Sequence, residues 1–159
     1  MKFAADGMLG KLTRWLRILG YDVKYSSKIE DQELIVLSTK EKRILLTRDL
    51  QLYRQATAKG IDSFYFEAEA TDERLAQLGK RYSLNLRIVM KKSRCPICNV
   101  KVKPISKEQA ALKVEPNTLK NYDEFWKCPK CGKIYWQGAH WKGIRKTLKK
   151  TLESLAESE

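Results

Sequence analysis

The sequence lacks any long apolar run, and it is short of acidic side chains. No stretch reaches the roughly 18 consecutive apolar residues that a membrane-spanning helix needs, so we expect no membrane contact. The first residues also lack an apolar signal segment, because Met1 and Lys2 lead directly into a short strand pattern. We therefore expect a cytoplasmic protein whose cysteines stay reduced.

The sequence contains only 19 Asp and Glu residues but 32 Lys and Arg residues, so its net charge is +13. Basic side chains are in excess both in residues 1–91 and in residues 92–159. A field of this sign attracts polyanions through phosphate neutralisation and counterion release. Nucleic acid is the natural partner, although a lysine-rich solvated surface is an alternative explanation.

Cysteine is also scarce, but its four copies fall into two C-x-x-C pairs. The pairs are separated by residues 99–127, and their members are Cys95, Cys98, Cys128 and Cys131. Each pair can form a knuckle, which is a tight turn whose backbone amides point at the two thiolates. The residue that follows each pair, Asn99 or Gly132, tolerates the positive φ that this turn needs. A thioredoxin-like redox site would need a βαβ context and would leave one pair unexplained. The spacing predicts a tetrahedral zinc site with four thiolate ligands.

Four protein ligands leave no open coordination position, so the predicted zinc is structural and not catalytic. Residues 92–159 lack a large apolar core of their own. Structural zinc supplies roughly 10 kcal/mol or more of folding free energy to such modules. We expect a zinc ribbon at 92–145, which follows a larger domain at 1–91 and precedes a basic helical tail at 146–159.

The first domain alternates between strand and helix patterns. Strand patterns are expected at 2–5, 23–25, 43–47, 61–66 and 86–90, and helical patterns at 8–19, from Asp31 onwards, at 49–58 and at 71–82. This alternation predicts an α/β fold with a mostly parallel sheet and flanking helices.

Three aspartates follow strands or begin helices in this pattern. Asp6 comes after the first strand, Asp31 begins a helix, and Asp49 follows the "RILLT" strand. Active groups of parallel sheets lie beyond the carboxyl ends of the strands. Clustered carboxylates would bind Mg²⁺ or Mn²⁺, which prefer oxygen ligands. Each aspartate could instead be a simple helix cap.

Basic and aromatic side chains form two further candidate groups. Lys11, Arg14 and Arg17 recur at helical spacing and could bind phosphate, or they could form a solvated helix face. Near the second knuckle lie the aromatic residues Trp136, His140 and Trp141. Bases could stack on them, or they could cover the ribbon core.

Three segments resemble a known family when they are taken together with the two knuckles: "FAADGMLGKLTRWLRILGYDV", "DQELIVLSTKEKRILLTRD" and "YWQGAHW". The family that they resemble is the Mut-seven C-terminal RNase family. This family combines a PIN-like nuclease domain with a zinc ribbon, and the resemblance covers most of residues 3–145. It implies a metal-dependent ribonuclease in which Asp6, Asp31 and Asp49 match the PIN acids. Thr47 and Arg48 belong to the same "TRD" motif.

The resemblance implies RNA as the partner, Mg or Mn as the catalytic ion and no small-molecule cofactor. The sequence departs from the pattern of PIN domains in one respect. Fuller PIN domains carry a further acidic residue between the positions of Asp6 and Asp31, and this chain has no clear counterpart. This departure leaves open an alternative function, a catalytically inert RNA-binding adaptor or a ribosome-associated factor.

Overall fold

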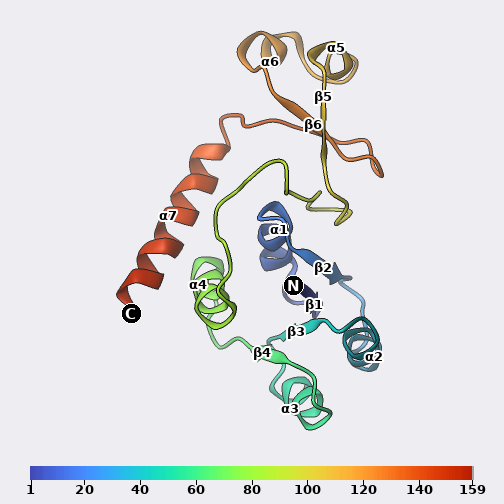
Figure 1. Ribbon diagram of the computed structural model, residues 1–159, viewed down its shortest axis with the longest axis vertical. Helices are drawn as coiled ribbons and strands as arrows, with labels where there is room; N and C mark the ends of the chain where they lie inside the picture. Colours follow the sequence, from blue (N-terminus) through green and yellow to red (C-terminus); the bar gives the residue numbers. More distant parts are fainter. Residues whose placement is uncertain (159) are drawn as a thin grey trace.

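The computed structural model describes residues 1–158, which form a parallel α/β domain, a small antiparallel ribbon and a long helix (Figure 1). The ribbon lies at one end of the molecule, and the long helix α7 runs from the ribbon back along the α/β domain beside α4. None of the helices within residues 1–158 combines the length and the apolar character needed to cross a membrane.

The sheet of the α/β domain has four parallel strands in the order β2-β1-β3-β4. Their bounds are β1 Lys2–Ala5, β2 Asp22–Tyr25, β3 Ile44–Thr47 and β4 Ser63–Tyr65. The register pairs Phe3 of β1 with Val23 on one side and Ile44 on the other. The two central strands are almost wholly buried, as is usual for parallel strands covered on both faces. The predicted parallel sheet is confirmed.

Helices cover both faces of this sheet because successive strand residues point to opposite sides. The helices are α1 Gly10–Ile18, α2 Asp31–Glu41, α3 Leu50–Ala58 and α4 Thr71–Tyr82. Phe3 and Leu46 belong to the apolar core on the side of α1 and α4. Ala4 and Leu45 belong to a second core with residues of α2 and α3. The result is a three-layer α/β domain.

The strand expected at 86–90 does not form, and this prediction is wrong. The segment is irregular chain that leads from α4 to the ribbon. Leu86 is nevertheless buried, and its side chain lies close to Gly79 of α4 and Leu155 of α7. Leu86 is therefore buried by packing against helices without pairing to a strand, whereas Val89 stays exposed.

The ribbon contains three antiparallel strands in the order β5-β6-β7 and two short helices. Their bounds are β5 Lys103–Ile105, α5 Lys107–Ala110, α6 Pro116–Asn121, β6 Phe125–Lys127 and β7 Ile134–Tyr135. A small separate core contains Ala110, Val114, Phe125 and Ile134. The insert between the knuckles thus supplies most of the ribbon's regular structure.

Helix α7 spans Trp141–Glu157, so it begins before position 146, where the tail is expected to start. Leu148 and Leu155 pack against the core of the α/β domain, and Lys150 pairs with Asp72 of α4 at 3.1 Å. Leu152 stays exposed. The helix therefore docks on α4 through Leu148, Leu155 and this ion pair.

Candidate active site and metal centre

Asp6 lies directly after β1, and it is only 7% exposed. Its Oδ1 accepts a hydrogen bond from the Met8 amide at 2.9 Å. Its Oδ2 accepts one from the Thr47 hydroxyl and one from the Arg48 amide, the latter at 2.9 Å. These donors hold the carboxylate in one orientation at the carboxyl edge of the sheet.

Thr47, the last residue of β3, connects Asp6 to Asp49. While its hydroxyl donates to Asp6, the same oxygen accepts the Asp49 amide at 2.9 Å. Asp49 is the N-cap of α3, and its Oδ1 accepts the amides of Gln51 and Leu52 at 2.9 and 3.2 Å. The side chain of Asp49 is exposed. Two of the three predicted aspartates thus share one hydrogen-bonded connection.

Asp31 is the first residue of α2, and its side chain is exposed without a hydrogen bond to any residue of 1–158. The N-cap is Glu30, whose amide donates to Oε2 of Glu33 at 3.1 Å. Asp31 is therefore not the helix cap that the pattern allowed. Asp31 lies at the same edge of the sheet as Asp6, because β1 and β2 are parallel and the Ser27 carbonyl in the loop after β2 lies against Gly7 in the loop after β1.

Two arginines add positive charge beside Asp6. Arg48 follows Thr47 and is half-buried. Arg74 of α4 is buried, and its Nε donates to the Ala68 carbonyl at 2.7 Å. Burial lowers the pKa of Arg74 and the charge of Arg48 lowers it further, whereas Glu69 and Asp6 act in the opposite direction. Arg74 is not among the residues predicted from the sequence, although it precedes Leu78 by one helical turn and so lies on the apolar face of α4.

The three basic residues of α1 have different environments. Lys11 and Arg14 are exposed. Arg17 is buried, and its guanidinium donates to the carbonyls of Val23, Pro96 and Ile97. The expected phosphate contact of Arg17 is therefore corrected to a structural role, since its donors are directed at main-chain oxygens. Lys11 and Arg14 remain predicted phosphate contacts.

The four cysteines come together in the ribbon. Their sulfur atoms all lie within 4.8 Å of one another, and Cys95 Sγ is 3.9 Å from Cys131 Sγ. Among residues 1–158 they are the one group of three or more candidate metal ligands that gathers in this way. Four thiol groups at this separation suit a tetrahedral metal ion such as zinc.

The backbone of each knuckle has the conformation that the sequence predicts. Asn99 and Gly132 adopt φ angles of 65° and 77°. Their amides donate to the carbonyls of Cys95 and Cys128, both at 2.9 Å. The two knuckles are thus equivalent turns that present paired sulfur atoms to a common centre.

The electrostatics of the cluster also suit a cation. Burial raises the pKa of Cys95, but bonds from the Tyr135 hydroxyl and from backbone amides outweigh it and hold that pKa at about 7. Burial and the neighbouring thiol groups raise the pKa of Cys98 to about 12, and they raise the pKa of Cys128 as well. A bound cation would relieve this repulsion and stabilise all four thiolates.

The first knuckle is attached to the α/β domain by polar contacts. The Asn99 side chain accepts the Val23 amide at 3.0 Å and donates to Asp22 at 2.7 Å. The Arg94 amide donates to the Arg17 carbonyl at 2.9 Å, and Arg17 in turn donates to carbonyls of the knuckle. The cysteine cluster is therefore coupled to β2 and α1 through side chains of both parts.

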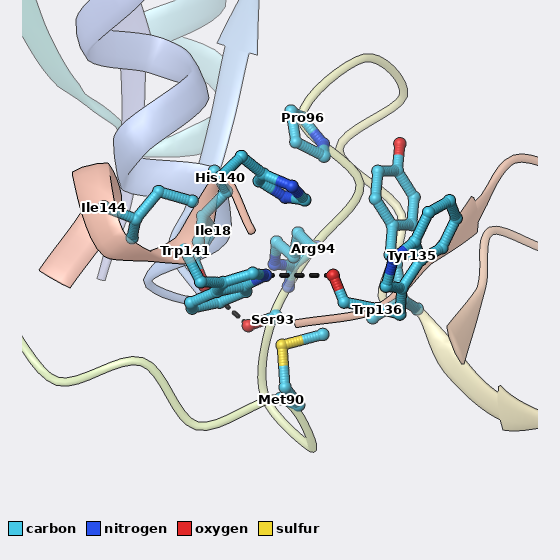
Figure 2. A pocket seen from close by; sticks show the side chains of 11 residues that line it. Ile18, Met90, Ser93, Arg94, Pro96, Tyr135, Trp136, His140, Trp141 and Ile144 are labelled. Atoms are coloured by element: carbon cyan, nitrogen blue, oxygen red, sulfur yellow. Dashed lines mark hydrogen bonds between the residues drawn. The ribbon is translucent and has the colours of Figure 1, made fainter. Parts of the chain in front are cut away.

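The predicted aromatic group lies where the ribbon meets α7, around a pocket (Figure 2). Trp141 is buried, and its Nε1 donates to the Trp136 carbonyl at 2.9 Å. Trp136 is half-buried against Phe125, while His140 is exposed. The structure brings these three predicted RNA contacts together around this pocket, which Ile18 at the end of α1 also lines.

Comparisons with known proteins give one match. No curated protein and no solved structure matches the chain. A family model described as the Mut7-C RNAse domain matches residues 1–148. That range contains the parallel sheet, the three aspartates, both cysteine knuckles and the first half of α7. The chain therefore belongs to the Mut7-C RNAse domain family.

Proposed function

We propose that the chain is a metal-dependent ribonuclease whose active site is the carboxyl edge of the parallel sheet. Family membership supports the nuclease activity and RNA as the substrate. The observation that supports this location is the hydrogen-bonded connection of Asp6, Thr47 and Asp49.

The residues at this edge suit Mg²⁺ or Mn²⁺ because they offer carboxylate oxygens, which hard cations prefer. Asp6 would be the fixed ligand, and the exposed carboxylates of Asp49 and Asp31 would complete the set. A bound ion would lower the pKa of a water molecule and neutralise charge on the phosphodiester. Thr47 would hold Asp6 in place, and Arg48 with Arg74 would attract the phosphate.

In this proposal the ribbon binds RNA and holds a structural zinc ion on its four cysteines. The ribbon contains few acidic residues, and the outer face of α7 is basic. Both features suit RNA, which is a polyanion. Lys11 and Arg14 would extend the basic surface along α1 towards Asp6.

The test compares cleavage of single-stranded and structured RNA by zinc-loaded wild type and Asp49→Asn with added manganese. Asparagine caps helices as well as aspartate does, so the variant should fold. Asp123→Asn removes the same charge from an exposed ribbon residue and is the matched control. We expect Asp49→Asn to lose at least about tenfold in rate, in line with a lost metal ligand. Equal cleavage by all three proteins would point to a contaminating nuclease and contradict the proposal.

A second candidate function is an inert RNA-binding adaptor. Two observations favour it. Within residues 1–158 the cysteine cluster is the one group of three or more candidate metal ligands that lie close together. In addition, Asp31 is hydrogen-bonded to neither Asp6 nor Asp49. This function predicts salt-sensitive RNA binding that survives Asp49→Asn, with no turnover in the presence of manganese.

A further inference from the structure

A pocket of about 170 Å³ lies at the junction of the α/β domain, the ribbon and α7 (Figure 2). It is bounded by the end of α1, the chain that leads into the first knuckle, β7 with the residues after it, and the start of α7. Its lining includes Ile18, Met90, Arg94, Trp136, Trp141 and Ile144. The pocket lies away from the carboxyl edge of the sheet, so the proposed active site does not use it.

The walls of this pocket are aromatic and held in place. Figure 2 shows His140 and Trp141 on one side and Tyr135 and Trp136 on the other. The bond from Trp141 Nε1 to the Trp136 carbonyl fixes one indole, and the packing of Trp136 on Phe125 fixes the other. An apolar cavity of about 150 Å³ holds one benzene ring. This pocket therefore has room for one planar aromatic ring.

The chain segments that line the pocket are basic. Every segment that lines it falls within residues 7–21, 74–107 or 125–152, and none of these ranges contains an aspartate or glutamate. Arg94 is fixed in the wall, with bonds from Nε to the Gly20 carbonyl and from Nη1 to the Asn99 carbonyl. Exposed basic residues adjoin the lining residues in the chain: Lys91, Lys92, Lys142 and Arg145.

We propose that this pocket binds one unpaired base of an RNA strand. The base would stack between the aromatic walls, while the surrounding cations hold the phosphates on either side of it. An apolar side chain of a protein partner would fill the pocket equally well, but it would leave these basic segments without a counterpart. The inference rests on the proposed function for its RNA substrate and adds where a base is held.

The position of the pocket also separates base binding from cleavage. Ile18 ends α1 and lines the pocket, whereas Asp6 lies just before the start of this helix. A helix of nine residues is about 13 Å long. The held base would therefore belong to a nucleotide at some distance from the bond that is cut.

The test measures binding by fluorescence anisotropy on the full zinc-loaded chain without added magnesium or manganese. The probes are a short labelled oligouridine and a chain of the same length that lacks all bases. We expect wild type to bind the oligouridine about tenfold more tightly, since a stacked base contributes this much. Ile144→Phe places a larger side chain in the pocket and should abolish this preference while affinity for the abasic chain stays the same.

Leu152→Phe is the matched control because Leu152 lies on the same helix, is exposed and does not line the pocket. It should keep the tenfold preference. If Ile144→Phe does not fold, His140→Ala removes an exposed ring that makes no side-chain hydrogen bond within residues 1–158, and it should lower the preference. Equal binding of both probes by wild type, or an unchanged preference in the folded pocket variants, would overturn the proposal.

The two proposals fail in different ways. If RNA binding depends on the bases but no metal-dependent cleavage occurs, the ribonuclease proposal is contradicted and the base-pocket proposal is supported. If cleavage depends on Asp49 but the oligouridine and the abasic chain bind equally well, the ribonuclease proposal is supported and the base-pocket proposal is contradicted.

Discussion

Thr47 shows how one side chain can hold a candidate active site together. It is fully buried, and its hydroxyl group both donates to Asp6 and accepts the Asp49 amide. A buried group that loses its hydrogen-bond partner destabilises a protein by about 1–3 kcal/mol. The hydroxyl of Thr47 therefore contributes to the stability of the fold and to the orientation of both aspartates.

We predict that Thr47→Val loses about 1–3 kcal/mol in free energy of unfolding and most of any manganese-dependent cleavage. Valine has the same shape but removes one of the two donors to Asp6 Oδ2 and leaves the Asp49 amide without its partner. Urea denaturation and RNA cleavage are the two measurements. Thr47→Ser retains the hydroxyl and should keep most of both properties. Equal loss in the valine and serine variants would show that the methyl group matters and the hydroxyl does not.

Individual residues differ in how far the sequence predicts their roles. Asp49 could be identified as a helix cap because caps depend on the next three residues only. Arg17 shares its spacing with Lys11 and Arg14, yet it is buried by a knuckle whose Pro96 lies 79 positions away in the chain. No local pattern carries that information. Arg74 had a local signal in its place on the apolar face of α4.

At the scale of elements, regular alternation was informative and isolated apolar runs were not. Each of the four helices predicted in residues 1–91 forms within a few positions of its expected bounds, since each has an apolar face and a recognisable end. The run at 86–90 has apolar residues but no neighbouring strand with which to pair. The burial of Leu86 against α4 and α7 depends on a helix that comes much later in the chain.

The contact between β2 and the first knuckle should depend on pH. Asp22 of β2 bonds to Arg43 and to Asn99. Burial favours the protonated form of Asp22, but these two partners outweigh it and lower the pKa from 3.8 to about 2. A carboxyl group with a lowered pKa stabilises the fold above about pH 4, and this stabilisation disappears as the pH falls towards 2.

We predict that wild type is more stable than Asp22→Asn by up to about 2 kcal/mol near neutral pH. The difference should shrink between pH 4 and pH 2, because Asp22 becomes protonated there. Acid also releases thiolate-bound metal from both proteins, so the measured quantity is the difference in unfolding free energy at each pH. Asp123→Asn should track wild type throughout. A constant difference across this range would contradict the assigned role of Asp22.

At the scale of the whole molecule, the metal centre should influence the α/β domain as well as the ribbon. Arg17, Arg94 and Asn99 connect the first knuckle to α1 and β2. Four-cysteine modules derive most of their folding free energy from zinc. Loss of the ion should therefore release these three side chains from their partners.

We predict one zinc ion per chain, measured by atomic absorption, and a loosening of α1 and β2 when a chelator removes it. Hydrogen exchange followed by mass spectrometry should show faster exchange in peptides that cover Asp22–Tyr25. Peptides that cover α3, which packs on β3 and β4, are the internal control. Unchanged exchange in β2 after complete zinc removal would show that the two parts are independent.

The docking of α7 on α4 has a consequence for how the protein is made. Leu148 and Leu155 complete the apolar core around Leu78 and Leu86, but they are translated only after the whole ribbon. The nascent α/β domain therefore leaves part of its apolar surface open to water and to other chains while synthesis proceeds. Since such surface promotes aggregation, the growing polypeptide depends on prompt arrival of α7 or on chaperones that shield this face.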